Sequence, residues 1–123
     1  MLVVEDDPQL RELYRSALRS AGYAVVAVED GADALRQIEQ APPAAIVLDL
    51  ALPRVGGRDV LHELRSHSKT RQIPIVVVTG TDISDLEANA FASMLRKPIS
   101  VDALVSAVDK CVRRTDASSA ALS

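Results

Sequence analysis

The 123-residue sequence has a single cysteine, no tryptophan and only three aromatic side chains, Tyr14, Tyr23 and Phe91. One cysteine, Cys111, cannot form a disulfide within the chain, which is typical of a reducing compartment. We therefore expect a cytoplasmic protein in which Cys111 packs beside the apolar face of the last helix. So few aromatic rings provide no platform for stacking bases. The net charge of −3 also lacks the basic excess of a nucleic-acid-binding protein, so we expect no direct contact with nucleic acid.

Long apolar runs are missing as well. No segment approaches the roughly 20 apolar residues that cross a bilayer, and the first residues lack the pattern of a secretory signal, so we expect no membrane association. Apolar residues at 48% and charged residues at 25% are ordinary for one globular domain. We expect that domain to span residues 1–114, and the Ala/Ser-rich residues 115–123 to form a tail or the start of a linker.

What the chain contains is an alternation of short β-branched runs with segments of helical periodicity. Two of the runs, at residues 45–48 and 75–78, are apolar at every position, as expected when helices cover both faces of a parallel sheet. Because parallel strands need crossover helices, the alternation predicts a doubly wound α/β sheet. The five predicted strands lie at residues 2–4, 24–28, 45–48, 75–78 and 94–96.

The predicted helices carry recognisable end signals. Asp7 can cap the first helix, Pro8 suits its first position, and Gly22 can end it in a left-handed turn. Ser100 can cap the last helix, and a short fourth helix is predicted near residues 84–90. Asp7 is therefore assigned to a helix cap rather than to a site.

Polar residues follow four of the strands directly. Glu5 and Asp6 come after the first strand, Asp49 after the third, Thr79 after the fourth and Lys97 after the fifth. In open α/β sheets the ligand crevice lies outside the carboxyl ends of the strands, so these five side chains should converge. Three carboxylates in one crevice repel one another and take up protons unless a cation neutralises them.

The chemistry of this set indicates phosphoryl transfer. Oxygen ligands without a nearby histidine or cysteine favour Mg2+. Lys97 and Thr79 would supply a positive charge and a hydrogen-bond donor for an anion at the metal, and Asp49 could act as nucleophile. His62 and His67 are five residues apart, do not share a helical face, and are interpreted as surface residues.

Four segments, each at a strand end, resemble the signature segments of receiver domains. These are the response-regulator receiver domains of bacterial two-component (phosphorelay) signalling systems. The resemblance runs from about Leu2 to Arg114 and implies a flavodoxin-like sheet with strand order 2-1-3-4-5 and a signalling switch rather than an enzyme. The segments are Val3–Asp7, Val47–Pro53, Val78–Gly80 and Arg96–Pro98.

The resemblance implies a role for each residue of the acidic crevice. Asp49 matches the phosphoacceptor. Asp6 matches a direct Mg2+ ligand, Glu5 a ligand through water, and the backbone carbonyl of Ala51 the third protein ligand.

Further positions match the family beyond the acids. Thr79 matches the hydroxyl that bonds the phosphoryl oxygen, and Lys97 matches the ammonium that neutralises it, before a bond to Pro98 that is usually cis in the family. Gly57 matches the glycine that ends the loop after the acceptor, and Gly80 the small residue that admits a phosphodonor.

The same resemblance implies partners. The donor would be a sensor histidine kinase or a histidine phosphotransfer protein. The recipient of the signal would be an output domain or partner protein. A dimer that forms on phosphorylation is a further alternative.

Two alternatives compete with this hypothesis. An aspartate-nucleophile phosphatase would need a second aspartate two residues beyond Asp49, where Ala51 stands. A phosphorylation-independent interaction module would be favoured by loss of Asp49 or Lys97, and both are present.

The chain departs from the family pattern in one region. Thr79 and Lys97 are 18 positions apart, about one helical turn fewer than in most receivers, and Phe91 with Ala92 replaces the usual Gly-Ala. Met94 stands where the family has an aromatic residue. We therefore expect phosphorylation to reorder residues 80–92 instead of driving the usual threonine–aromatic switch.

Overall fold

The structure, a computed structural model, describes residues 1–52, 55–80 and 91–122, and in the last helix the side chains as far as residue 113. Five strands form one sheet in the order β2-β1-β3-β4-β5, and every neighbouring pair is parallel. This confirms the predicted doubly wound fold and its strand order. The strands are β1 (Leu2–Val4), β2 (Val26–Val28), β3 (Ile46–Asp49), β4 (Ile75–Thr79) and β5 (Ser93–Arg96).

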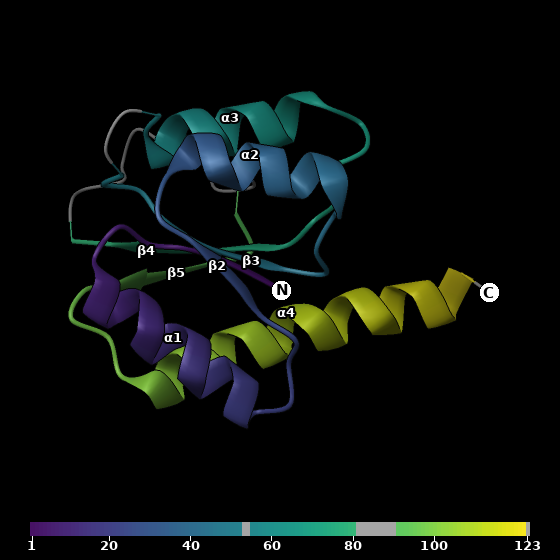
Figure 1. The fold of residues 1–123 in the computed structure, drawn as a ribbon. Helices are drawn as coiled ribbons and strands as arrows, with labels where there is room; N and C mark the ends of the chain where they lie inside the picture. The colour runs from purple at the N-terminus through teal and green to yellow at the C-terminus, as the bar shows by residue number, and fades with distance from the viewer. Residues whose placement is uncertain (53–54, 81–90, 123) are drawn as a thin grey trace.

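Helices cover both faces of this sheet. Helices α2 and α3 lie on one face and α1 and α4 on the other (Figure 1). The short fourth helix predicted near residues 84–90 lies outside the described residues, so α4 corresponds to the predicted last helix. The four helices in the described part of the chain are α1 (Pro8–Ser20), α2 (Gly31–Gln40), α3 (Gly57–Ser66) and α4 (Val101–Leu122).

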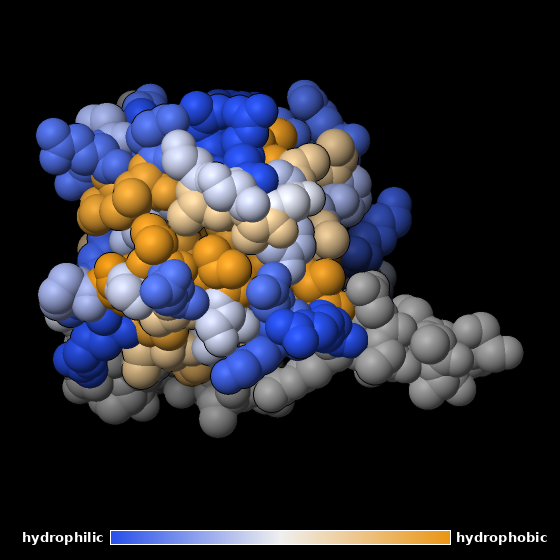
Figure 2. All heavy atoms as spheres, turned by 90° about the horizontal axis from the view of Figure 1, so that it is seen from below, coloured by the Kyte–Doolittle hydropathy of each residue, from blue (hydrophilic) through white to orange (hydrophobic). Residues whose placement is uncertain are grey.

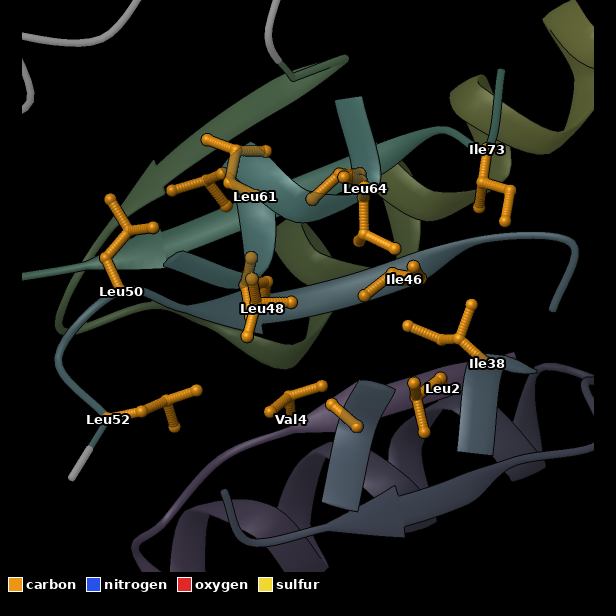
Figure 3. Packing of buried hydrophobic residues seen from close by; sticks show 14 residues of the cluster. Leu2, Val4, Ile38, Ile46, Leu48, Leu50, Leu52, Leu61, Leu64 and Ile73 are labelled. Carbon is orange, nitrogen blue, oxygen red and sulfur yellow. The ribbon is translucent and has the colours of Figure 1, made fainter. Parts of the chain in front are cut away.

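The core has two layers because successive side chains of a strand point to opposite faces. Figure 3 shows part of the layer between the sheet and α2 and α3, where side chains of β1 and β3 gather with those of the two helices. On the other face, Val3 and Val47 pack with residues of α1 and α4, among them Cys111, which is 4% exposed. Cys111 therefore packs in the core, as predicted.

Helix α1 begins and ends where its capping residues predict. The Asp7 side chain accepts hydrogen bonds from the backbone amides of Gln9 and Leu10 at 2.9 and 3.2 Å, and Pro8 is the first helical residue. Gly22 has a φ of 102°, in the left-handed region. The Asp7 cap orients the chain immediately after Glu5 and Asp6.

Helix α4 is longer than the sequence suggests. It continues to Leu122 through the Ala/Ser-rich residues 115–122, where a tail or linker is expected. The reason is that alanine is the best helix former and that the segment contains neither glycine nor proline. Its C-terminal part extends beyond the sheet (Figure 1), and the boundary at residue 114 stays a prediction.

The face that carries α1 and α4 is mixed in polarity. Apolar side chains gather in its middle and charged ones lie around them (Figure 2). Leu13 on α1 and Val26 on β2 are large apolar residues that are 47% and 45% exposed. In the described residues, no helix combines the length and the apolar character needed to cross a bilayer.

Candidate functional site

The predicted site residues meet at the carboxyl edge of the sheet. Asp49 is the last residue of β3 and pairs with Val78 of β4, while Thr79, the last residue of β4, pairs with Arg96 of β5. Glu5 follows β1, which pairs with β3. The parallel register therefore brings these strand ends side by side, as the sequence predicts.

Three carboxylates form a compact cluster there. Glu5, Asp6 and Asp49 each offer an oxygen, and these oxygens lie within 4.8 Å of one another. Glu5 and Asp49 are 1% and 3% exposed, whereas Asp6 is exposed. An oxygen-only donor set with two buried carboxylates and one exposed side fits a hard cation such as Mg2+.

Lys97 joins two of these carboxylates. Its Nζ donates to Glu5 Oε1 at 2.8 Å and to Asp49 Oδ2 at 3.3 Å. Burial acts to lower the pKa of Lys97, but the hydrogen bond to Glu5 and the charge of Asp49 outweigh it and raise the pKa above its ordinary value. Lys97 is therefore held as a cation inside the site.

The environment of the cluster changes the pKa of Glu5. The pKa of Glu5 is raised from 4.5 to about 7, chiefly by burial and by the hydrogen bond with Asp49, against the opposing effect of Lys97. Proton uptake is the response expected of crowded carboxylates without a neutralising cation.

The loop after β3 packs tightly on the Asp49 backbone. The Ala51 amide donates to Asp49 Oδ1 at 2.9 Å, which fixes the carboxylate. A Cβ on Gly57 would lie 2.3 Å from the Asp49 carbonyl oxygen and 2.4 Å from the Leu50 Cα. Only glycine fits at position 57, because its neighbours are backbone atoms that cannot rotate away.

The remaining predicted residues complete the crevice. Thr79 is fully buried at the end of β4. Gly80 is exposed, and among the described residues a Cβ there would meet Lys97 Cβ at 4.0 Å. The bond between Lys97 and Pro98 is cis, as the resemblance implies.

One residue that contacts the site, Arg11, is absent from the sequence-based set. Nη1 of Arg11 donates to the backbone carbonyls of Glu5 at 3.1 Å and Asp6 at 3.4 Å. The direction of helical side chains toward the N-terminus is a signal that could have indicated Arg11.

The histidines lie away from this site. Both are exposed on or just after α3, and His67 Nε2 lies 2.7 Å from Glu63 Oε1. This agrees with their interpretation as surface residues.

Comparison with known proteins identifies the family. Residues 1–109 match the model of the response regulator receiver domain. This chain belongs to the response-regulator receiver domains. The receiver domain is 37% identical over 126 residues to the response regulator MprA of Mycobacterium bovis (strain BCG / Pasteur 1173P2), an alignment that covers 98% of this chain and 54% of that protein. The receiver thus spans about half the length of the curated relatives that it matches.

Solved structures agree with this assignment. A sensor protein from Polaromonas sp. JS666 has a TM-score of 0.85 at 30% identity, covering 92% of the receiver and 94% of that chain. The chemotaxis response regulator CheY4 of Vibrio cholerae, at 24% identity, has a TM-score of 0.81 over 89% of the receiver and 95% of that chain, and it shows the likeness of fold.

The sequence predicts a departure from the family pattern at β5. Met94 is half-buried, lies opposite Val77 and packs against the core layer of α2 and α3, as does Phe91 just before the strand. Most of the segment 80–92, which we expect phosphorylation to reorder, lies outside the described residues. The expectation about switching therefore stays a prediction.

Proposed function

We propose that this receiver domain is a signalling switch that accepts a phosphoryl group on Asp49 with the help of Mg2+. One observation carries the proposal. The Asp49 carboxylate is buried and lies 3.3 Å from the Lys97 ammonium. One of its oxygens lies within 4.8 Å of an oxygen of Glu5 and of an oxygen of Asp6. In this proposal Asp49 is the nucleophile, the Lys97 ammonium supplies a positive charge, and the carboxylate cluster supplies metal ligands.

The cation would be held by this chain's oxygens. Asp6 and Asp49 would bind Mg2+ directly, Glu5 through water, and the backbone carbonyl of Ala51 would complete the protein ligands. When bound, Mg2+ supplies positive charge that offsets the charge of the transferring phosphoryl group. The raised pKa of Glu5 agrees with this assignment, because burial and the neighbouring Asp49 carboxylate disfavour its charged form despite the opposing effect of Lys97.

The side chains have distinct parts in the transfer. An oxygen of the Asp49 carboxylate forms a bond to phosphorus as the phosphorus–nitrogen bond of a phosphohistidine donor breaks, and the imidazole leaves with that electron pair. The Lys97 ammonium offsets the charge of the phosphoryl oxygens. The Thr79 hydroxyl donates a hydrogen bond to one of these oxygens, which holds the phosphorylated state.

The partners follow from the family. The donor would be a sensor histidine kinase or a histidine phosphotransfer protein, and the signal would pass to an output domain or a separate protein. Because matched curated relatives are about twice as long as this receiver, an output domain on the same chain is the simpler arrangement.

Phosphorylation by a small donor tests the proposal. Incubation with acetyl phosphate and Mg2+ should give one phosphoryl adduct by intact mass, and both Asp49→Asn and EDTA should abolish it. Asp7→Asn is a matched control, because it also removes one carboxylate near the site but retains a helix-capping side chain. An undiminished adduct in Asp49→Asn would disprove the assignment, and no adduct on the wild type would favour a phosphorylation-independent interaction module.

A further inference from the structure

Arg11 links helix α1 to the main chain that carries the acidic pair. Its guanidinium donates through Nη1 to the Glu5 carbonyl at 3.1 Å and to the Asp6 carbonyl at 3.4 Å. The contact is partly buried, while Asp6 itself is exposed. A long side chain is therefore immobilised on the backbone of two residues whose carboxylates belong to the cluster.

The position of Arg11 in α1 explains this contact. It is the fourth helical residue, and helical side chains lean toward the N-terminus, so its guanidinium lies over the chain that enters the helix. The Glu5 amide still pairs with the Val28 carbonyl of β2 at 3.1 Å, but the Glu5 carbonyl is bonded by Arg11. Arg11 thus provides the hydrogen bond to the first carbonyl beyond β1.

We infer that Arg11 is a positioning residue for the cation site. The carboxylates of Glu5, Asp6 and Asp49 repel one another, and Asp6 is the one exposed to solvent, whereas Glu5 and Asp49 are buried. Fixing the two carbonyls restricts the main chain from which Glu5 and Asp6 project and keeps their oxygens near Asp49. The inference rests on the proposed function, because it concerns the binding of the cation proposed there.

A role through charge alone predicts the opposite sign. A guanidinium near the cluster repels a divalent cation, so its removal would strengthen Mg2+ binding if charge were its main effect. If Arg11 acts by fixing the main chain, its removal weakens binding. Loss of groups that orient metal ligands typically costs 10–100-fold in affinity, and we expect about tenfold here because the contact is to backbone.

Helix α1 provides a matched control. Arg15 lies one turn further along the helix, where its guanidinium pairs with Glu12 at 2.8 Å. Arg15→Met removes the same charge from the same helix. A difference between Arg11→Met and Arg15→Met therefore isolates the contact with the main chain.

Titration of the metal-free protein with MgCl2, followed by the backbone amide resonances near Glu5, Asp6 and Asp49, tests the inference. Arg11→Met should raise the Mg2+ Kd about tenfold, Arg15→Met should leave it within about twofold, and Arg11→Lys should fall between because an ammonium can keep one of the two bonds. Thermal unfolding in EDTA verifies that each variant folds. If Arg11→Met does not fold, the comparison of Arg11→Lys with Arg15→Lys carries the test.

The outcomes are separable. If the wild type binds Mg2+ and Arg11→Met binds it equally or more tightly, the positioning role is wrong. The proposed function is unaffected by that result. A wild type whose site resonances do not respond to MgCl2 overturns the proposed metal site, and the inference with it.

Discussion

Glu5 lies between an ammonium and a second carboxylate, and its side chain is 1% exposed. The Lys97 ammonium lies 2.8 Å from the Glu5 carboxylate and favours the charged form of Glu5. Burial and the neighbouring Asp49 outweigh this effect and raise the pKa of Glu5 to about 7. In the absence of a cation this residue holds a proton near neutrality that the unfolded chain would release. If the site binds the proposed cation, neutralisation of these carboxylates should stabilise the fold, which would link metal binding to folding.

The free energy of unfolding in EDTA should therefore fall as the pH rises from about 4.5 to about 7. Below 4.5 the Glu5 carboxyl is protonated in both the folded and the unfolded chain, and its contribution is fully present. As the pH rises through the folded pKa that contribution is lost, at a cost of up to about 3 kcal/mol. Urea unfolding at a series of pH values measures it.

Two variants isolate the effect. Glu5→Gln cannot titrate and should flatten the profile in this window. Glu39→Gln, the same change at an exposed position on α2, should keep the wild-type slope. A wild-type stability that rises between these pH values would contradict the account of Glu5.

At the scale of elements, the site depends on how α3 begins against the end of β3. Gly57 is the first residue of α3, and its amide donates to the Leu50 carbonyl at 3.3 Å. A Cβ at this position would lie within 2.4 Å of the backbone of Asp49 and Leu50. The helix can approach the acceptor strand this closely only with glycine at the contact.

Gly57→Ala should consequently destabilise the fold by about 2–3 kcal/mol, at the high end of overpacking, because backbone rather than side-chain atoms must move. Gly56→Ala is the control, since among the described residues a Cβ there meets the Asp59 carboxylate at 3.5 Å, an ordinary van der Waals contact. It should change stability by no more than about 1 kcal/mol. Chemical denaturation measures the free energy of unfolding of both variants. Equal losses of stability would contradict the argument that the close contact at position 57 requires glycine.

At the scale of the whole molecule, the sequence predicts the fold and the convergence of the site. Strands β3 and β4 are apolar at every position before their last residue, a pattern typical of a buried parallel sheet. Once the sheet is parallel, residues that follow its strands must meet at one edge. The convergence of Glu5, Asp49, Thr79 and Lys97 can therefore be predicted from the sequence.

Other features could not be predicted because they depend on three-dimensional contacts. The bond from Arg11 to the main chain of Glu5 and Asp6 needs the entry angle of α1, and the need for glycine at position 57 needs the distance between α3 and β3. The extension of α4 through residues 115–122 was missed for a different reason. An alanine-rich composition suits both a linker and a helix, and composition alone does not separate them.

The central claim is that the phosphoryl group resides on Asp49, and chemical mapping tests it most directly. Borohydride reduces an acyl phosphate to an alcohol, so an aspartyl phosphate becomes homoserine, which peptide mass analysis assigns to one position. After treatment with acetyl phosphate and Mg2+, we predict homoserine at position 49 alone, and none when EDTA replaces Mg2+. Homoserine at Asp6 or another carboxylate, with Asp49 unmodified, would contradict the account.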